Sequence, residues 1–172
     1  MTLLVVMAGL PGSGKSTVAR AIGARLTAAV IAVDPIDAAL RRAGVAADAA
    51  GLGAYLAAEA VAEDVLRGGL PVVLDAVNAV EPARQQWRDV AARWAVPMVV
   101  VEVVCSDPAL HRARLEGRSR DLVGLPEPSW DAVRRRAAEY APWPEPVLRL
   151  DSADPLGDNV EAALTAIAAD RA

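Results

Sequence analysis

Short apolar runs alternate along the chain with longer segments in which apolar residues recur every three or four positions. The short runs hold few charged residues and many β-branched ones, which is the pattern of strands buried in a parallel sheet. They cover residues 3–8, 29–33, 70–74, 98–104 and 147–150. We therefore predict five strands, each followed by a change to helical periodicity.

The segments between these runs have the apolar spacing of amphipathic helices. Helices are predicted over residues 16–26, 35–42, 52–66, 82–94, 108–116, 130–140 and 156–169, and the helix 52–66 carries the apolar series Leu52, Leu56, Ala60, Val61 and Val65. The alternation predicts one α/β domain over residues 1–172, with a parallel sheet and helices on both faces. Because the chain has no phenylalanine, aliphatic side chains and alanine must fill its core.

The first strand leads into a glycine-rich loop and then into a helix. The loop reads Gly9-Leu10-Pro11-Gly12-Ser13-Gly14-Lys15-Ser16, followed by Thr17, and matches the pattern G-x-x-x-x-G-K-[ST]. Lys15 is the only lysine among the 18 basic residues, which fits a site that needs a slim, flexible ammonium between phosphates. We expect residues 9–17 to hold a nucleoside triphosphate and the Ser16 hydroxyl to bind Mg²⁺.

Acidic residues follow three of the predicted strands. Asp75 ends the third strand and has the position of a Walker B carboxylate, which binds Mg²⁺. Asp34 ends the second strand and is a candidate for the base that deprotonates an acceptor hydroxyl, although its place before Pro35 also suits a helix cap. Asp107 precedes Pro108 and is explained as an N-cap.

Arginines gather in the helix 108–116 and in the polar loop that follows it, at Arg112, Arg114, Arg118 and Arg120. Arg114 and Arg118 are four positions apart, so a helix or its extension presents both on one face. Phosphoryl transfer needs positive charge over the transferred group. We therefore predict an arginine-bearing lid at about residues 112–128, in which Arg114 and Arg118 are catalytic. A solvated charged loop is the alternative.

Composition narrows the possible partners and compartments. A formal net charge of −4 and a pI near 5.0 argue against an extended nucleic-acid surface.

Cys105 is the sole cysteine, which excludes an intramolecular disulfide, and we interpret it as a small buried residue. His111, the only histidine, is expected on a helix surface. The chain shows no leader-like start and no run of about 18 apolar residues, so we expect a cytoplasmic protein without a membrane span.

Together these motifs resemble those of the small P-loop kinases related to the kinase half of polynucleotide kinase phosphatase, chloramphenicol phosphotransferase and zeta toxin, which are usually named AAA-family ATPases. The resemblance rests on residues 8–17, 72–78 and 110–118. It implies the P-loop NTPase fold with strand order 2-3-1-4-5 and the use of ATP with Mg²⁺. It also implies that Asp34 is a general base, that Thr17 lies near the α-phosphate and that the two arginines form a lid.

The acceptor side of the predicted site departs from one branch of this family. Polynucleotide 5′-hydroxyl kinases of the group usually have an arginine three residues after the base, where this chain has Asp37. An acidic residue there would repel a nucleic-acid backbone, although Arg41 or Arg42 could replace the missing arginine. Tyr55 and Asn78 are further candidates for the acceptor pocket.

These features predict ATP-dependent transfer of the γ-phosphoryl group to a hydroxyl of a small-molecule acceptor. One alternative is a polynucleotide or nucleoside 5′-hydroxyl kinase, and another is a non-catalytic ATP-binding switch. A regulatory GTPase is excluded, because its N-K-x-D element needs a lysine other than Lys15.

Overall fold

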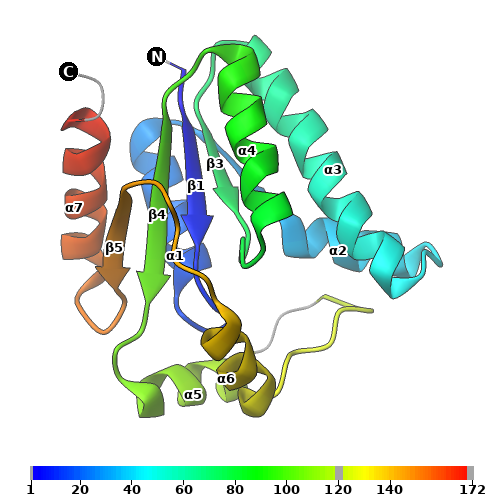
Figure 1. Cartoon of the computed structure of the whole chain (residues 1–172). Coiled ribbons are helices and arrows are strands. Elements are labelled where there is room, and N and C mark those ends of the chain that lie inside the picture. Colours follow the sequence, from blue (N-terminus) through cyan, green and yellow to red (C-terminus); the bar gives the residue numbers. More distant parts are fainter. Residues whose placement is uncertain (1, 119–121, 170–172) are drawn as a thin grey trace.

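The computed structural model describes residues 2–118 and 122–169 and contains a five-stranded parallel sheet (Figure 1). The strands are β1 (Leu4–Ala8), β2 (Ala29–Ala32), β3 (Val72–Asp75), β4 (Met98–Val104) and β5 (Val147–Asp151). Their order across the sheet is β2-β3-β1-β4-β5, with every neighbouring pair parallel. The predicted fold class and strand order are therefore confirmed.

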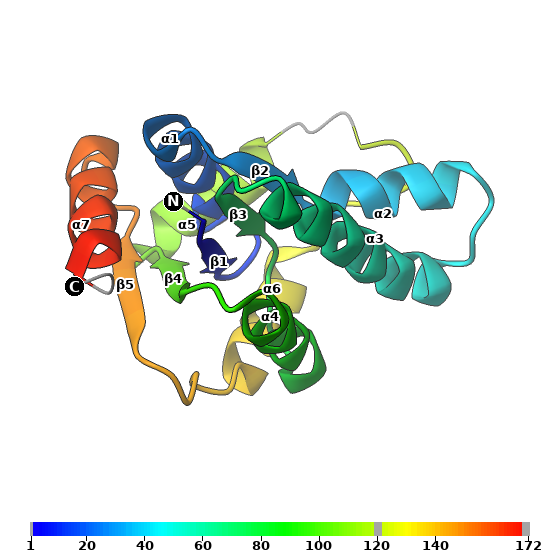
Figure 2. The same cartoon turned by 90° about the horizontal axis from the view of Figure 1, so that it is seen from above.

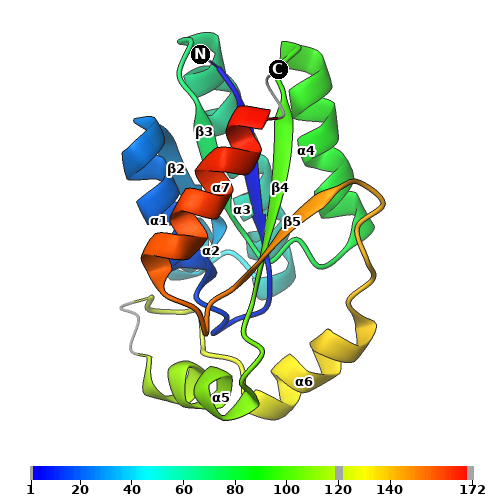
Figure 3. The ribbon, with the colours of Figure 1, turned by 90° about the vertical axis from the view of Figure 1, so that its left-hand side faces the viewer.

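Seven helices are present in the described ranges: α1 (Lys15–Leu26), α2 (Val33–Arg42), α3 (Ala47–Arg67), α4 (Glu81–Trp94), α5 (Pro108–Gly117), α6 (Trp130–Glu139) and α7 (Leu156–Ala169). Helices α1 and α7 cover one face of the sheet, and α3 and α4 cover the other (Figure 2). Helices α5 and α6 lie beyond the carboxyl ends of the strands (Figure 3). None of these helices is long and apolar enough to cross a membrane.

Helix α3 packs through a different face from the one its leucines suggest. Its buried residues are Ala50, Ala54, Ala58, Ala62 and Leu66, spaced four apart. Leu52 and Leu56 are instead 65% and 55% exposed. The predicted apolar face was therefore wrong. Alanine side chains let the helix lie close to its neighbours, whereas leucines at the same positions would need more space than a close-packed interior leaves.

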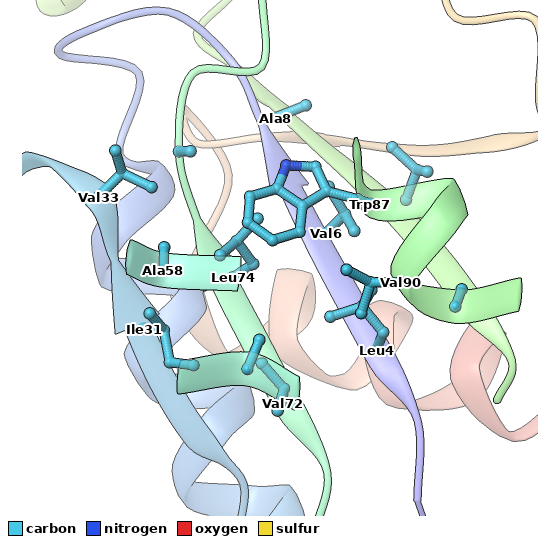
Figure 4. Close-up of a cluster of buried hydrophobic side chains, with 14 of the residues drawn as sticks. Leu4, Val6, Ala8, Ile31, Val33, Ala58, Val72, Leu74, Trp87 and Val90 are labelled. Atoms are coloured by element: carbon cyan, nitrogen blue, oxygen red, sulfur yellow. The ribbon is translucent and has the colours of Figure 1, made fainter. Parts of the chain in front are cut away.

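Trp87 lies at the centre of the core between the sheet and α4 (Figure 4). It is fully buried among aliphatic side chains of β1, β3 and α4. Its indole Nε1 donates a hydrogen bond to Asn78 Oδ1 at 3.0 Å, and Asn78 Nδ2 donates to the Met7 carbonyl oxygen at 2.7 Å. These bonds fix the segment after β3 against the end of β1, and so place Asp75 beside the loop that follows β1.

Candidate active site at the phosphate loop

Glycines in left-handed conformations shape the loop between β1 and α1. Gly9, Gly12 and Gly14 have φ angles of 134°, 84° and 88°, which residues with a Cβ rarely adopt. At Gly9 a Cβ would also lie 2.3 Å from the Val103 carbonyl oxygen. The sequence therefore permits a tight backbone turn at the N-terminus of α1, where N–H groups and the helix dipole favour bound phosphate.

Lys15 and Asp75 form a buried ion pair at the base of this loop. Lys15 Nζ lies 2.7 Å from Asp75 Oδ1, and the two side chains are 10% and 7% exposed. Lys15 is the first residue of α1, and Asp75 is the last residue of β3, which neighbours β1 in the sheet. The parallel topology thus joins the phosphate-loop lysine to the strand-end carboxylate.

A cavity of about 930 Å³ extends from the loop over the carboxyl ends of the strands. Its lining includes residues 10–17 together with Asp34, Asp75, Arg114 and Arg118. Loop, strand-end carboxylates and both lid arginines therefore share one cavity. Gly9 does not line it and lies instead against β4.

Asp34 is the second residue of α2, not the residue that caps it. The N-cap position belongs to Ala32, and no side chain accepts a capping hydrogen bond there. A capping hydrogen bond is therefore not the reason for an aspartate at position 34. A negative charge in the first helical turn is still favourable. The side chain is partly exposed and lines the cavity, where a carboxylate can accept a hydrogen bond from a hydroxyl group.

The two lid arginines are held by different parts of the chain. Arg114 donates from Nη1 to Ser152 Oγ at 2.8 Å and from Nη2 to the Ser152 carbonyl oxygen at 3.1 Å. Arg118 donates from Nε to Glu127 Oε2 at 2.7 Å and also contacts that oxygen through Nη2. Arg114 therefore joins the wall after β5, whereas Arg118 is bound within the segment between α5 and α6.

Other charged candidates are engaged away from the cavity. Arg41 Nε lies 2.7 Å from Asp37 Oδ1, and Arg41 Nη2 lies 3.2 Å from Asp37 Oδ2. The two charges balance one another on α2, so Arg41 is held by Asp37 and its role as a phosphate-gripping arginine stays a prediction. Arg112 is likewise paired with Glu116 on the exposed surface of α5. Arg120 falls outside the described residues.

Tyr55 and Asn78 belong to the packing behind the cavity and do not line it. Asn78 is fully buried, and both ends of its amide are bonded within the core. The Tyr55 ring packs near Trp87 with ring centroids 6.2 Å apart. Burial raises the pKa of the Tyr55 hydroxyl to about 12, opposed by a hydrogen bond with the Asn78 backbone. Both residues predicted to contact an acceptor therefore occupy supporting positions.

The sequence interpretation missed a second wall of the cavity, which follows β5. The cavity is also lined there by Ser152, Asp154, Leu156 and Asn159, and on α1 by Arg20. Asn159 Nδ2 donates to the Asp151 carbonyl oxygen at 2.7 Å and so ties α7 to the end of β5. The sequence held a signal for this wall, because the carboxyl ends of parallel strands converge at one edge of the sheet. The same argument that placed Asp34 and Asp75 at this edge also places the residue after β5 there.

His111 is buried against the phosphate loop, so its expected surface position was wrong. Its Nε2 lies 2.8 Å from the Pro11 carbonyl oxygen. Because a carbonyl can only accept, Nε2 carries the proton in this contact. The ring also meets the Trp130 ring edge-on, with centroids 5.1 Å apart. Helix α5 packs against the phosphate loop, and His111 lies on the side of the helix that contacts the loop. The helical pattern of the sequence does not show which side of α5 makes this contact.

A family model described as AAA domain matches residues 4–140. This chain belongs to the AAA-domain family. The matched region includes the phosphate loop, Asp34, Asp75 and both lid arginines, but not the wall that follows β5. Among curated proteins, none matches the sequence.

Solved structures share the fold of this AAA-domain protein. A sugar kinase from Janibacter sp. HTCC2649 aligns with a TM-score of 0.70 at 18% identity, over 96% of this chain and 94% of the other. The APS kinase CysC of Mycobacterium tuberculosis, in complex with AMPPNP and APS, gives 0.68 at 19% identity, over 96% and 97%. Kti12 of Chaetomium thermophilum, in complex with ADP-AlF3, gives 0.68 at 24% identity, over 95% and 98%. Likeness at these identities establishes the fold.

Proposed function

We propose that this AAA-domain protein is an ATP-dependent phosphotransferase that moves the γ-phosphoryl group of ATP to a hydroxyl of a small-molecule acceptor. The observation that carries the proposal is the single cavity shared by the phosphate loop, Asp34, Asp75 and Arg118. Holding a nucleotide needs the loop alone. Phosphoryl transfer needs, in addition, a carboxylate on the acceptor side and positive charge over the transferred group.

The Lys15–Asp75 pair fits a nucleotide site that exchanges one anion for another. On ATP binding, the Lys15 ammonium would exchange the Asp75 carboxylate for phosphate oxygens and stay paired with negative charge. The carboxylate released in this way, with the Ser16 hydroxyl, offers the hard oxygen ligands that suit Mg²⁺. Mg²⁺ held there would neutralise charge on the phosphates. Two protein ligands suffice for such an ion, because phosphate oxygens and water complete its shell.

Asp34 is the residue that we assign to the acceptor. Its carboxylate would orient the acceptor hydroxyl and accept its proton as the phosphoryl group is transferred. Arg118, which Glu127 holds at the cavity wall, would stabilise charge on the transferred group by exchanging that carboxylate for phosphoryl oxygens. Arg114, which donates a hydrogen bond to Ser152 beside the phosphate loop, would supply a second positive charge in the cavity.

A small acceptor suits the charge distribution better than nucleic acid does. The net charge of −4 disfavours a phosphate backbone. Asp37 and Arg41 pair with each other, so together they offer no net positive charge to a nucleic-acid backbone. The names of two proteins that share the fold, a sugar kinase and an APS kinase, also point to small acceptors.

The proposal is tested by incubating the purified protein with labelled ATP, Mg²⁺ and a panel of acceptors. The panel holds hydroxyl-bearing antibiotics, nucleosides, sugars and 5′-hydroxyl oligonucleotides. We expect label on one class of small acceptor. Asp34→Asn should lower kcat by a factor of about 100 or more, the range attributed to a general base, with little change in KM for ATP. Asp89→Asn, on the exposed surface of α4, is the matched control and should behave as wild type.

Two outcomes would contradict the assignment in different ways. Labelling of the oligonucleotide alone would make the protein a polynucleotide kinase. If no acceptor is labelled and Asp34→Asn hydrolyses ATP at the wild-type rate, the assignment of Asp34 as the base fails and the result favours an ATP-binding switch.

A further inference from the structure

A second cavity, of about 280 Å³, lies behind the phosphate loop. It is lined by the segment after β1, by β4 and the residue after it, by Arg149 of β5 and by helices α5 and α6. Its walls include Ser13, Glu102, Cys105 and Tyr140. Leu10 and Ser13 line both cavities, so the phosphate loop itself is the partition between them. A group that enters the second cavity therefore acts on the loop from its reverse side.

The Ser13 hydroxyl marks this cavity as a place for a ligand. The residue is only 1% exposed, and its Oγ has no hydrogen-bond partner among the described residues. Oγ lies on the side of Gly9 and β4, because a Cβ at Gly9 would be 3.1 Å from Oγ and 2.3 Å from the Val103 carbonyl oxygen. Buried hydroxyls are nearly always hydrogen-bonded, and a hydroxyl can donate as well as accept, so the unpartnered Ser13 Oγ indicates that a ligand with a polar group can bind in this cavity.

Cys105, the sole cysteine, stands at the rim of the same cavity. It is partly exposed, and not buried as the sequence suggested. Its thiol donates to the Asp107 carbonyl oxygen at 3.4 Å, and its Sγ lies 3.9 Å from Arg114 Nη1. A reagent can therefore reach the sulfur, and a substituent on it has the second cavity as adjoining space.

Arg114 connects this thiol to the nucleotide cavity. The nitrogen that approaches Cys105 Sγ, Nη1, also donates to Ser152 Oγ at 2.8 Å. A Cβ at Gly14 would lie 3.9 Å from the same nitrogen, so the guanidinium lies near the phosphate loop. A second sulfur bonded to Cys105 Sγ would need the space beside Arg114 Nη1. It would therefore displace the guanidinium from Ser152 and Gly14.

We propose that Cys105 is a site of reversible thiol modification by small disulfides, and that the adduct weakens nucleotide binding. The Cys105 thiol loses its proton to solvent, and its sulfur attacks one sulfur of the disulfide. The new S–S bond forms as the old one breaks, and the other half leaves as a thiolate. The ammonium of a cystamine adduct can donate to Ser13 Oγ. The Glu102 carboxylate in the same wall is already paired with Arg149, whose Nη2 lies 2.7 Å from Glu102 Oε2. This proposal rests on the part of the proposed function that concerns nucleotide binding. It does not depend on the identity of the acceptor or on phosphoryl transfer.

The test uses cystamine as the probe and calorimetric titration with ATP and Mg²⁺ as the readout. Intact-mass measurement establishes that one adduct has formed. We expect the modified protein to bind ATP at least about tenfold more weakly, the order expected when a charge-assisted contact is lost, and to recover with dithiothreitol. Bound ATP should slow the modification, because coupling between two sites is reciprocal.

The matched control moves the same adduct away from the loop. Cys105→Ser should bind ATP as wild type and resist cystamine. Cys105→Ser combined with Ala92→Cys, on the exposed surface of α4, should accept the adduct without losing affinity. The proposal is overturned if fully modified wild type binds ATP with unchanged affinity. It is equally overturned if cystamine modifies the introduced thiol of the control variant but leaves native Cys105 unmodified.

Discussion

The ion pair between Lys15 and Asp75 sets the charge balance of the phosphate loop. Both side chains are nearly buried, and Nζ lies 2.7 Å from Oδ1. Two buried charges stabilise the fold only as a pair, since removal of one leaves the other desolvated without compensation. The same residues therefore serve stability and, in the proposed function, ligand binding, and the two roles can be separated by mutation.

Replacing Lys15 with methionine should lower the free energy of unfolding by about 3–5 kcal/mol, because the Asp75 carboxylate loses its partner. The double variant Lys15→Met with Asp75→Asn should recover most of this loss, since no buried charge remains. Urea titration of wild type and both variants measures the effect. Neither variant should bind ATP tightly. Equal stability of the single variant and wild type would show that the pair contributes nothing to the fold.

At the scale of elements, Arg84 joins α4 to two other segments of the chain. This arginine is 1% exposed. It donates to the carbonyl oxygens of Asn78, Ala141 and Pro142 at 3.0, 2.8 and 3.0 Å. Its guanidinium also lies over the Trp143 ring, 4.3 Å from the centroid. One helix thus fixes the segment after β3 and the connection from α6 to β5.

Replacing Arg84 with methionine should destabilise the protein by about 2–4 kcal/mol, because three carbonyl groups lose the donors of a buried guanidinium and an aromatic contact is lost. Arg135→Met, at an exposed position of α6, is the control and should change the free energy of unfolding by less than about 0.5 kcal/mol. Chemical denaturation followed by circular dichroism compares the two variants. Similar values for both would mean that the buried guanidinium is dispensable.

At the scale of the whole molecule, the proposed nucleotide site joins segments that are distant in the sequence. The cavity is lined by residues of the loop after β1, the start of α2, the end of β3, helix α5 and the segment after β5. A ligand that contacts all of these binds the folded chain and not the unfolded one. Its binding free energy is then added to the stability of the whole fold.

Saturating ATP with Mg²⁺ should therefore raise the melting temperature. At a ligand concentration of 100 times Kd the added stability is about 2.7 kcal/mol. Asp34→Asn should keep this shift, because the acceptor-side carboxylate is not proposed to bind the nucleotide, whereas Lys15→Met should lose most of it. Differential scanning fluorimetry is the measurement. A normal shift in Lys15→Met would contradict nucleotide binding at the phosphate loop.

Much of this architecture could be predicted from local patterns. The five strands lie within a few residues of their predicted positions, and the phosphate loop lies between β1 and α1 as its motif requires. The ends of parallel strands meet at one edge, so Asp34 and Asp75 could be assigned to one site before their surroundings were known. The helix 52–66 was found, but its buried face and its start at Ala47 were not.

The sequence by itself determined the elements, the phosphate loop and the family, because hydrophobic periodicity and turn chemistry act between residues that are close along the chain. Only the tertiary structure decided which face of α3 is buried, that His111 supports the loop, and that Arg114 binds Ser152 while Arg41 is paired with Asp37. These outcomes depend on the space and the partners that distant elements offer each other. No local pattern carries that information, because the free energy of each such contact belongs to two segments at once.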